Sequence, residues 1–281
     1  MILSAGQYAN QILTGDNREL IRQLPDASVD VVLGSPPYNL GRAARSGIQA
    51  SPLYPDNALQ DPSLDPDEYI ARIVAFCKEA ERVVKLQGTL ILVMGYGVHH
   101  GAQQIWDLFS AIGRQTQWYA QDAPVWKKDR MGPAGIHNNP VALDRRVEYI
   151  GVFMRKEMKP QSKAHHSHVN KQLNDKGNAF LSPAISTFIE APSGNQLGDL
   201  KATFSEELVD KLLQTYAPLP ATSSSSSPAN NNATVLDPWM GSGTTAIACK
   251  RLGLNYVGFE IHAPTAAAAR QRVGKITAAR L

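Results

Sequence analysis

The chain has 281 residues, 43% of them hydrophobic, which is enough to bury a core in one large α/β domain or two small ones. No apolar run approaches the ~20 residues of a membrane span, the N-terminal segment lacks the pattern of a signal peptide, and two cysteines in helix-like segments predict buried free thiols. These features argue against a membrane protein or a disulfide-stabilised secreted domain and favour a cytoplasmic location, while the net charge of +3 permits a polyanionic partner.

Apolar runs alternate with amphipathic segments along the chain, and this alternation predicts an α/β fold. Strands are expected at 11–15, 29–35, 89–95, 118–126, 146–154, 233–237 and 255–260, and helices at 66–86, 100–112, 204–216, 243–252 and 263–280. This order predicts a doubly wound, mostly parallel sheet of seven strands with helices on both faces. Thr203 and Glu206 have the spacing of a capping box, so we expect a helix to begin near residue 204.

The segment Ser-Pro-Pro-Tyr at 35–38 follows a strongly apolar run. Its two prolines remove two backbone donors and fix two φ angles near about −65°, so the chain is rigid where it leaves the strand. A planar, amino-bearing ring could stack on Tyr38 while its NH₂ group donates to Ser35 and to the carbonyl of Pro36. From these four residues alone, a proline-rich turn with an ordinary surface tyrosine is an equal alternative.

A second informative segment, ATVLDPWMGSGTT, occupies residues 233–245. An apolar run ends at Asp237, a turn with Gly241 and Gly243 follows, and a helix is expected to begin near Thr244. A strand, a glycine-rich turn and a helix N-terminus form a binding corner for a nucleotide-like ligand. The next apolar run ends at Glu260, about 20 residues further on, where a carboxylate is placed to accept hydrogen bonds from ribose hydroxyls.

SPPYN together with DPWMGSGTT resembles the S-adenosylmethionine-dependent amino-methyltransferases of DNA, which methylate cytosine N4 or adenine N6. The catalytic motif precedes the cofactor loop, which is the circularly permuted order of the β group. GTLILVMG, WKKDRMGP and RRVEYIGVFMRK also resemble strands of this family, so the resemblance covers nearly the whole chain. It implies a seven-stranded, Rossmann-like methyltransferase sheet whose chain ends lie close together.

The resemblance also implies site residues. Ser35, Pro36, Pro37 and Tyr38 would hold the target base, and Asp16 would contact the adenine of the cofactor unless it only caps a helix at 17–24. The implied cofactor is S-adenosyl-L-methionine and no metal is required. Asp237 would either brace the glycine loop or reach the amino-acid end of the cofactor. The full implied cofactor set is Asp16, Phe204, Asp237, Pro238, Trp239, Gly241, Gly243, Thr244 and Glu260.

Positive charge is concentrated in one segment of the chain. Between Arg155 and Lys176, six Lys or Arg residues accompany only two acids, and three histidines lie among them. The segment is either a solvated loop or, as we prefer, a DNA-contacting insertion. The candidate DNA-binding residues are Asn39, Arg42, Arg45, Lys163, Lys171 and Lys176. The expected organisation is a catalytic part at 1–155, a target-recognition insertion at 156–196 and a cofactor-binding part at 197–281, with a flexible Ser/Asn-rich loop at 218–232.

The resemblance leaves the target base open. Serine before Pro-Pro-Tyr is more typical of the cytosine-N4 members, so we expect N4 methylation of cytosine in double-stranded DNA after base flipping, in a restriction–modification or orphan modification role. Adenine-N6 methylation is the close alternative. A cofactor-binding DNA protein without turnover, and a methyltransferase of RNA or protein amides, are the alternatives from other classes. A homodimer is a further state that the family allows.

Overall fold

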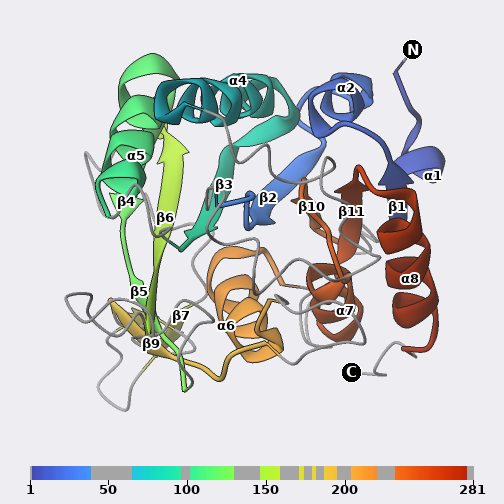
Figure 1. Cartoon of the computed structure of the whole chain (residues 1–281). Coiled ribbons are helices and arrows are strands. Elements are labelled where there is room, and N and C mark those ends of the chain that lie inside the picture. The colour runs from blue at the N-terminus through green and yellow to red at the C-terminus, as the bar shows by residue number, and fades with distance from the viewer. Residues whose placement is uncertain are drawn as a thin grey trace, which may run out of the picture.

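The computed structural model describes residues 2–38, 65–95, 102–129, 146–158, 187–194, 204–219 and 232–276, together with the backbone of two short strands at 171–173 and 179–181. Within these ranges nine strands form one sheet, in the order β1-β11-β10-β2-β3-β6-β5-β9, with β4 paired to β6. Helices lie on both sides of this sheet (Figure 1). The expected α/β fold is therefore confirmed. No helix in these ranges is long and apolar enough to cross a membrane.

The strands of the main sheet are β1 (Gln11–Thr14), β2 (Val29–Gly34), β3 (Val84–Met94), β4 (Trp118–Asp122), β5 (Val125–Lys127), β6 (Val147–Arg155), β9 (Phe188–Glu190), β10 (Thr234–Asp237) and β11 (Asn255–Glu260). A separate antiparallel pair consists of β7 (Lys171–Leu173) and β8 (Ala179–Leu181). The helices are α1 (Ala5–Tyr8), α2 (Asn17–Leu20), η1 (Ile21–Gln23), α4 (Pro66–Val83), α5 (Gln103–Gln115), η4 (Lys156–Met158), α6 (Glu206–Tyr216), α7 (Thr244–Arg251) and α8 (Ala263–Gly274).

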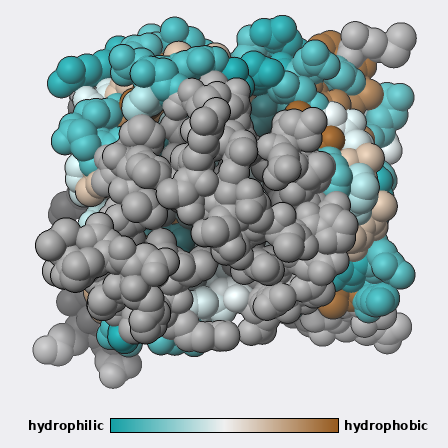
Figure 2. Space-filling model, viewed as in Figure 1, coloured by the Kyte–Doolittle hydropathy of each residue, from teal (hydrophilic) through white to brown (hydrophobic). Residues whose placement is uncertain are grey.

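The central strands are buried on both faces, so their side chains divide between two cores. In β2, Val31 and Leu33 pack with α6, α7 and α8, whereas Val32 faces the opposite way and packs with α4 and α5. This alternation is the period of two that a strand imposes on its side chains. The outward side of α4 is hydrophilic (Figure 2), whereas Ile73 and Phe76 on its inward side are buried. The apolar runs in the sequence therefore mark the parallel, doubly covered part of the sheet.

The sheet departs from the expected seven strands in two places. The run expected at 118–126 divides into β4 and β5, because Pro124 has no N–H to donate and the pairing with β6 shifts register between Ala120 and Asp122. β9 was not expected. It pairs in parallel with β5 and lies within the segment 156–196, so part of the expected insertion extends the main sheet.

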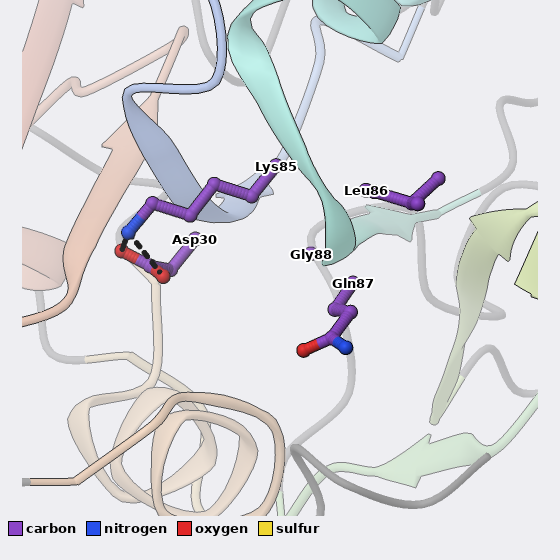
Figure 3. Close-up of a pocket in the computed structure, with 5 residues that line it drawn as sticks. All are labelled: Asp30, Lys85, Leu86, Gln87 and Gly88. Carbon is purple, nitrogen blue, oxygen red and sulfur yellow. Dashed lines mark hydrogen bonds and ion pairs between the residues drawn. The ribbon is translucent and has the colours of Figure 1, made fainter.

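The start of β3 is irregular, and this irregularity produces a pocket far from the motifs. The helix expected to reach residue 86 ends at Val83, and the pairing of β3 with β2 shifts register between Val29 and Val31. Asp30, Lys85, Leu86, Gln87 and Gly88 line the pocket, in which the Asp30 carboxylate accepts a hydrogen bond from Lys85 Nζ at 2.8 Å (Figure 3). It lies where β2 begins, whereas the Ser-Pro-Pro-Tyr motif follows the end of that strand.

The helix near residue 204 begins as expected but with a different cap. The Ser205 hydroxyl caps α6 by accepting a hydrogen bond from Leu208 N at 3.3 Å, and Glu206 is the first residue of the helix. The expected capping box between Thr203 and Glu206 is therefore wrong, because its acidic member lies two positions too early in the helix. Thr203 itself lies outside the described residues.

The last described helix packs against the first strand. Arg270 of α8 donates hydrogen bonds to Ile12 O at 2.9 Å and to Thr14 Oγ1 at 2.6 Å. The expectation that the two ends of the chain lie close together concerns terminal residues outside the described ranges and stays a prediction. Cys77 and Cys249 are buried and free, as expected, and burial raises the pKa of both thiols.

Candidate active site

The two sequence motifs meet at the carboxyl ends of neighbouring parallel strands. β2 ends at Gly34 and β10 ends at Asp237, and the two strands pair directly. A Cβ atom on Gly34 would lie 2.9 Å from Trp239 Cε3 and 3.1 Å from Asp237 Oδ1, so only glycine fits there. The segment that begins at Ser35 therefore leaves the sheet beside the turn that follows Asp237. Ligand sites of open α/β sheets lie at this edge.

Asp237 braces the glycine-rich turn. Its Oδ1 accepts a hydrogen bond from Trp239 N at 3.0 Å, and its Oδ2 accepts one from Thr245 Oγ1 at 2.5 Å. The expected role as a brace is therefore present, and a contact with the amino-acid end of the cofactor stays a prediction. The carboxyl is buried, and this burial raises its pKa to about 7 in spite of the two hydrogen bonds.

The raised pKa makes stability depend on pH. The unfolded chain ionises Asp237 near pH 4, whereas the folded chain keeps it protonated up to about pH 7, so its contribution is fully present below pH 4 and is lost as the pH rises to 7. We expect the free energy of unfolding to lose up to about 4 kcal/mol over this range relative to Asp237→Asn, whose amide cannot ionise. Chemical denaturation of both proteins at several pH values measures the difference. A difference in the free energy of unfolding that stays constant with pH would contradict the raised pKa of Asp237.

The glycine-rich turn needs its two glycines. Gly241 and Gly243 have positive φ angles of 50° and 83°, a region that favours glycine. A Cβ on Gly243 would also approach Val273 Cγ2 to 3.0 Å. Gly243 is the N-cap of α7 and offers no side chain to its first turn, so an acceptor from a ligand can take that place.

Glu260 holds this turn from the neighbouring strand. Its Oε2 accepts a hydrogen bond from Gly241 N at 2.9 Å, and its Oε1 accepts one from His262 N at 2.9 Å. Burial raises the pKa of this carboxyl. Thr244, the first residue of α7, faces the protein, because its Oγ1 lies 3.1 Å from Ser242 Oγ and accepts a hydrogen bond from Arg272. Arg272 was not singled out in the sequence, and it fastens the turn to Glu206 of α6.

Asp16 and its neighbours lie beside the same turn. Gly15 N donates a hydrogen bond to Glu260 O at 3.0 Å, and Asn17 Nδ2 donates one to Pro238 O at 3.3 Å. The Asp16 carboxylate caps α2 by accepting from Arg18 N at 2.8 Å, and its hydrogen bonds with the Arg18 side chain lower its pKa. The helix-cap role is therefore present, and the contact with a cofactor stays a prediction.

Two aromatic residues of the expected cofactor set are partly buried. Trp239 packs against Phe76 of α4 with ring centroids 5.1 Å apart, so its ring is anchored in the core on one side. Phe204 packs against the opposite core, immediately before α6. Both keep an exposed part, and a role in cofactor binding stays a prediction for each.

The Ser-Pro-Pro-Tyr segment forms a hydrogen-bonded chain that reaches a buried carboxylate. Ser35 Oγ donates to Tyr38 OH at 2.8 Å, and Tyr38 OH donates to Glu148 Oε2 at 2.9 Å. Glu148 pairs with Lys128. Burial, followed by the charge of Glu148, raises the pKa of Tyr38 well above its usual value. Glu148 and Lys128 were missed in the sequence, where the available signal was a carboxylate inside the apolar run of β6.

Most of the expected DNA-binding residues lie outside the residues that the structure describes. Asn39, Arg42, Arg45, Lys163 and Lys176 lie outside the described residues, and of Lys171 only the backbone, in β7, is described. Their contacts with DNA therefore stay predictions. Among the residues that the structure does describe, no group of three or more His, Cys, Asp or Glu side chains could hold a metal ion.

Comparison with known proteins identifies the family. A family model described as DNA methylase matches residues 29–271. The chain belongs to this DNA methylase family. It is 24% identical over 277 residues to the type II methyltransferase M.BglII from Bacillus subtilis, covering 91% of this chain but only 66% of that protein. The fold is similar to PvuII DNA methyltransferase (cytosine-N4-specific), with a TM-score of 0.69 and 16% identity over 95% of this chain and 89% of the other. It is also similar to M1.HpyAVI in its SAM complex, with a TM-score of 0.59 and 21% identity over 94% and 98% of the two chains.

Proposed function

We propose that this chain transfers a methyl group from S-adenosyl-L-methionine to the exocyclic N4 amino group of cytosine in double-stranded DNA, after the base has been flipped out. The observation that carries this proposal is the contact between Gly34 and the turn after Asp237. Because of it, the residues suited to hold an amino-bearing ring lie beside the residues suited to hold a nucleotide-like cofactor.

The cofactor corner fits S-adenosyl-L-methionine, which supplies an activated methyl group on a sulfonium. The uncapped first turn of α7 suits the cofactor's carboxylate, and the positive φ angles of Gly241 and Gly243 let the backbone approach a ligand closely. Glu260 ends β11 beside the turn, with lone pairs available to ribose hydroxyls in addition to its two backbone hydrogen bonds.

Ser35 and Pro36 prepare the amino group for attack. An exocyclic amino nitrogen is a poor nucleophile, because its lone pair is delocalised into the ring. Acceptors at Ser35 Oγ and Pro36 O hold its two N–H groups and turn the lone pair toward the methyl group. As the new N–C bond forms, the methyl–sulfur bond breaks and its electron pair stays on sulfur, which leaves as a neutral thioether. The same acceptors stabilise the positive charge on nitrogen until nitrogen releases one proton to water.

Two observations favour cytosine over adenine. Serine stands before Pro-Pro-Tyr, as is more typical of the cytosine-N4 members, and a protein of similar fold is itself cytosine-N4-specific. The motif order supports a place in the circularly permuted β group. Adenine N6 is the alternative target, since the family includes both activities.

Nucleoside analysis of treated DNA tests this function. Duplex DNA of mixed sequence is incubated with the protein and methyl-labelled S-adenosyl-L-methionine, digested and analysed by mass spectrometry. We expect label in N4-methylcytosine. Label in N6-methyladenine would overturn the choice of base, and the absence of label from DNA, with label in RNA or protein, would overturn the choice of substrate.

The basic insertion gives a separate prediction about DNA. Replacing Lys163, Lys171 and Lys176 together with Ala should weaken DNA binding and lower the slope of log affinity against log salt by up to roughly 0.9 per lost phosphate contact. The affinity for S-adenosyl-L-methionine should not change. Titrations of DNA at several salt concentrations measure the slope. An unchanged slope would move the DNA contact to the segment 40–65.

A further inference from the structure

The strongest feature that the proposed reaction does not explain is a buried ion pair beside the motif. Glu148 lies near the start of β6, and Lys128 follows β5, which is the strand that pairs with this part of β6. The side chains of Lys128 and Glu148 are only 16% and 8% exposed. A carboxylate buried this deeply is costly unless its partners satisfy it. Its second partner is the hydroxyl of Tyr38.

The chemistry of these groups fixes the direction of every hydrogen bond in the chain. An ionised carboxylate can only accept, so Tyr38 OH must donate its single proton to Glu148 Oε2, 2.9 Å away. The phenol oxygen then has only lone pairs left, and it accepts the proton of Ser35 Oγ at 2.8 Å. Ser35 Oγ, having given its proton to Tyr38, can offer only lone pairs to any further partner.

We propose that Glu148, held by Lys128, is a positioning residue that makes Ser35 an acceptor before the target amino group arrives. This inference rests on the proposed function. Without Glu148, the hydroxyl of Tyr38 could turn and donate to Ser35, and the proton of Ser35 would then point toward the amino group instead of away from it. A dipole that is already oriented toward the developing charge costs no reorganisation during the reaction.

The packing around Tyr38 keeps this chain in place. A Cβ on Gly95 would lie 2.7 Å from Tyr38 Cε2 and 3.4 Å from Glu148 Oε1, so the tyrosine ring lies directly on the backbone at the end of β3. Lys128 Nζ lies 5.2 Å from the centre of the Trp126 ring, and Lys128 N donates to Arg146 O at 2.7 Å. β3, β5 and β6 together therefore fix Glu148 relative to Ser35.

The test is a double-mutant cycle in single-turnover methyl transfer to DNA. Tyr38→Phe and Glu148→Gln should each slow transfer by roughly tenfold or more, because each removes a group that fixes the direction of the hydrogen bonds. Phe has no hydroxyl, and the amide of Gln can donate as well as accept, so it no longer forces Tyr38 OH to donate away from Ser35. The double variant should be no slower than the slower single variant. The affinity for S-adenosyl-L-methionine should stay unchanged in all three, which separates the effect from a loosened site. Glu190→Gln is the matched control, since Glu190 pairs with the neighbouring Lys127 at the surface, and it should transfer at the normal rate.

Glu148→Gln leaves the Lys128 ammonium buried without its partner and could fail to fold. Lys128→Met combined with Glu148→Gln removes both charges, and its rate should match that of Tyr38→Phe. Normal rates in Tyr38→Phe or in this paired variant, or effects that multiply in the cycle, would overturn the inference. If the wild-type protein itself does not methylate cytosine in DNA, the proposed function fails instead, so the two failures are distinguishable.

Discussion

Ser35→Ala should slow methyl transfer to DNA by roughly 30- to 1,000-fold, equivalent to about 2–4 kcal/mol of transition-state stabilisation. The hydroxyl lies at the carboxyl end of β2, and its proton is committed to Tyr38, so the mutation removes an acceptor and leaves the backbone of the two prolines in place. Because Ser35 does not contribute to the glycine-rich turn, the affinity for S-adenosyl-L-methionine should stay nearly the same. Single-turnover kinetics and calorimetric titration measure the two quantities separately.

A serine at the opposite end of β2 provides the control. Ser28 precedes β2, and its Oγ donates to Pro25 O at 2.7 Å, at the end of the strand away from the motif. Ser28→Ala therefore removes a hydroxyl without touching the candidate site and should leave the transfer rate normal. If Ser35→Ala transferred as fast as Ser28→Ala, the Ser-Pro-Pro-Tyr segment would be only a turn.

The second large effect concerns the cofactor corner. Glu260→Ala should weaken S-adenosyl-L-methionine binding by roughly 10- to 100-fold, because hydrogen bonds to a charged group contribute about 1.5–3 kcal/mol each. The mutation releases Gly241 N and His262 N and removes the expected acceptor for ribose hydroxyls. Gly241→Val should have a similar effect, since its φ of 50° is strained for a β-branched residue.

Calorimetric titration of the folded variants with S-adenosyl-L-methionine tests this prediction. Glu207→Ala is the control, because Glu207 is exposed on α6 and pairs with Lys211 in the next turn, and its removal should leave cofactor affinity unchanged. Wild-type affinity in both Glu260→Ala and Gly241→Val would mean that the cofactor binds elsewhere.

The elements with strong local signals were predictable from the sequence. β11 has the expected bounds, and β2, β10, α6 and α7 begin and end within one or two residues of expectation, because each is an apolar run or periodic segment bounded by turn residues. The glycine turn was also predictable, since strand, turn and helix follow one another directly. The brace was one of the two roles expected for Asp237, and the structure shows its hydrogen bonds. The same local reasoning placed β2 and β10 in one sheet.

The errors arise where distant parts of the chain decide the structure. Residues 84–88 join β3 because β2 pairs with Val84 and then again from Thr89 onward, across an irregular register. β9 exists because β5 offers it an edge. Glu148 could not be recognised as part of the site, because its partner Tyr38 is separated from it by the whole of β3 and α5. The local signal for Glu148 was a charged residue within an apolar strand.

The central claim is that the ends of β2 and β10 form one site for amino methylation of DNA. A crystal structure of the protein with duplex DNA and a non-reactive analogue of S-adenosyl-L-methionine tests it most directly. We expect an extrahelical cytosine with its ring against Tyr38, its amino nitrogen within hydrogen-bonding distance of Ser35 Oγ and Pro36 O, and the analogue bound over Gly241 and Gly243. A base bound away from Ser35, or an analogue bound away from the glycine-rich turn, would contradict the account.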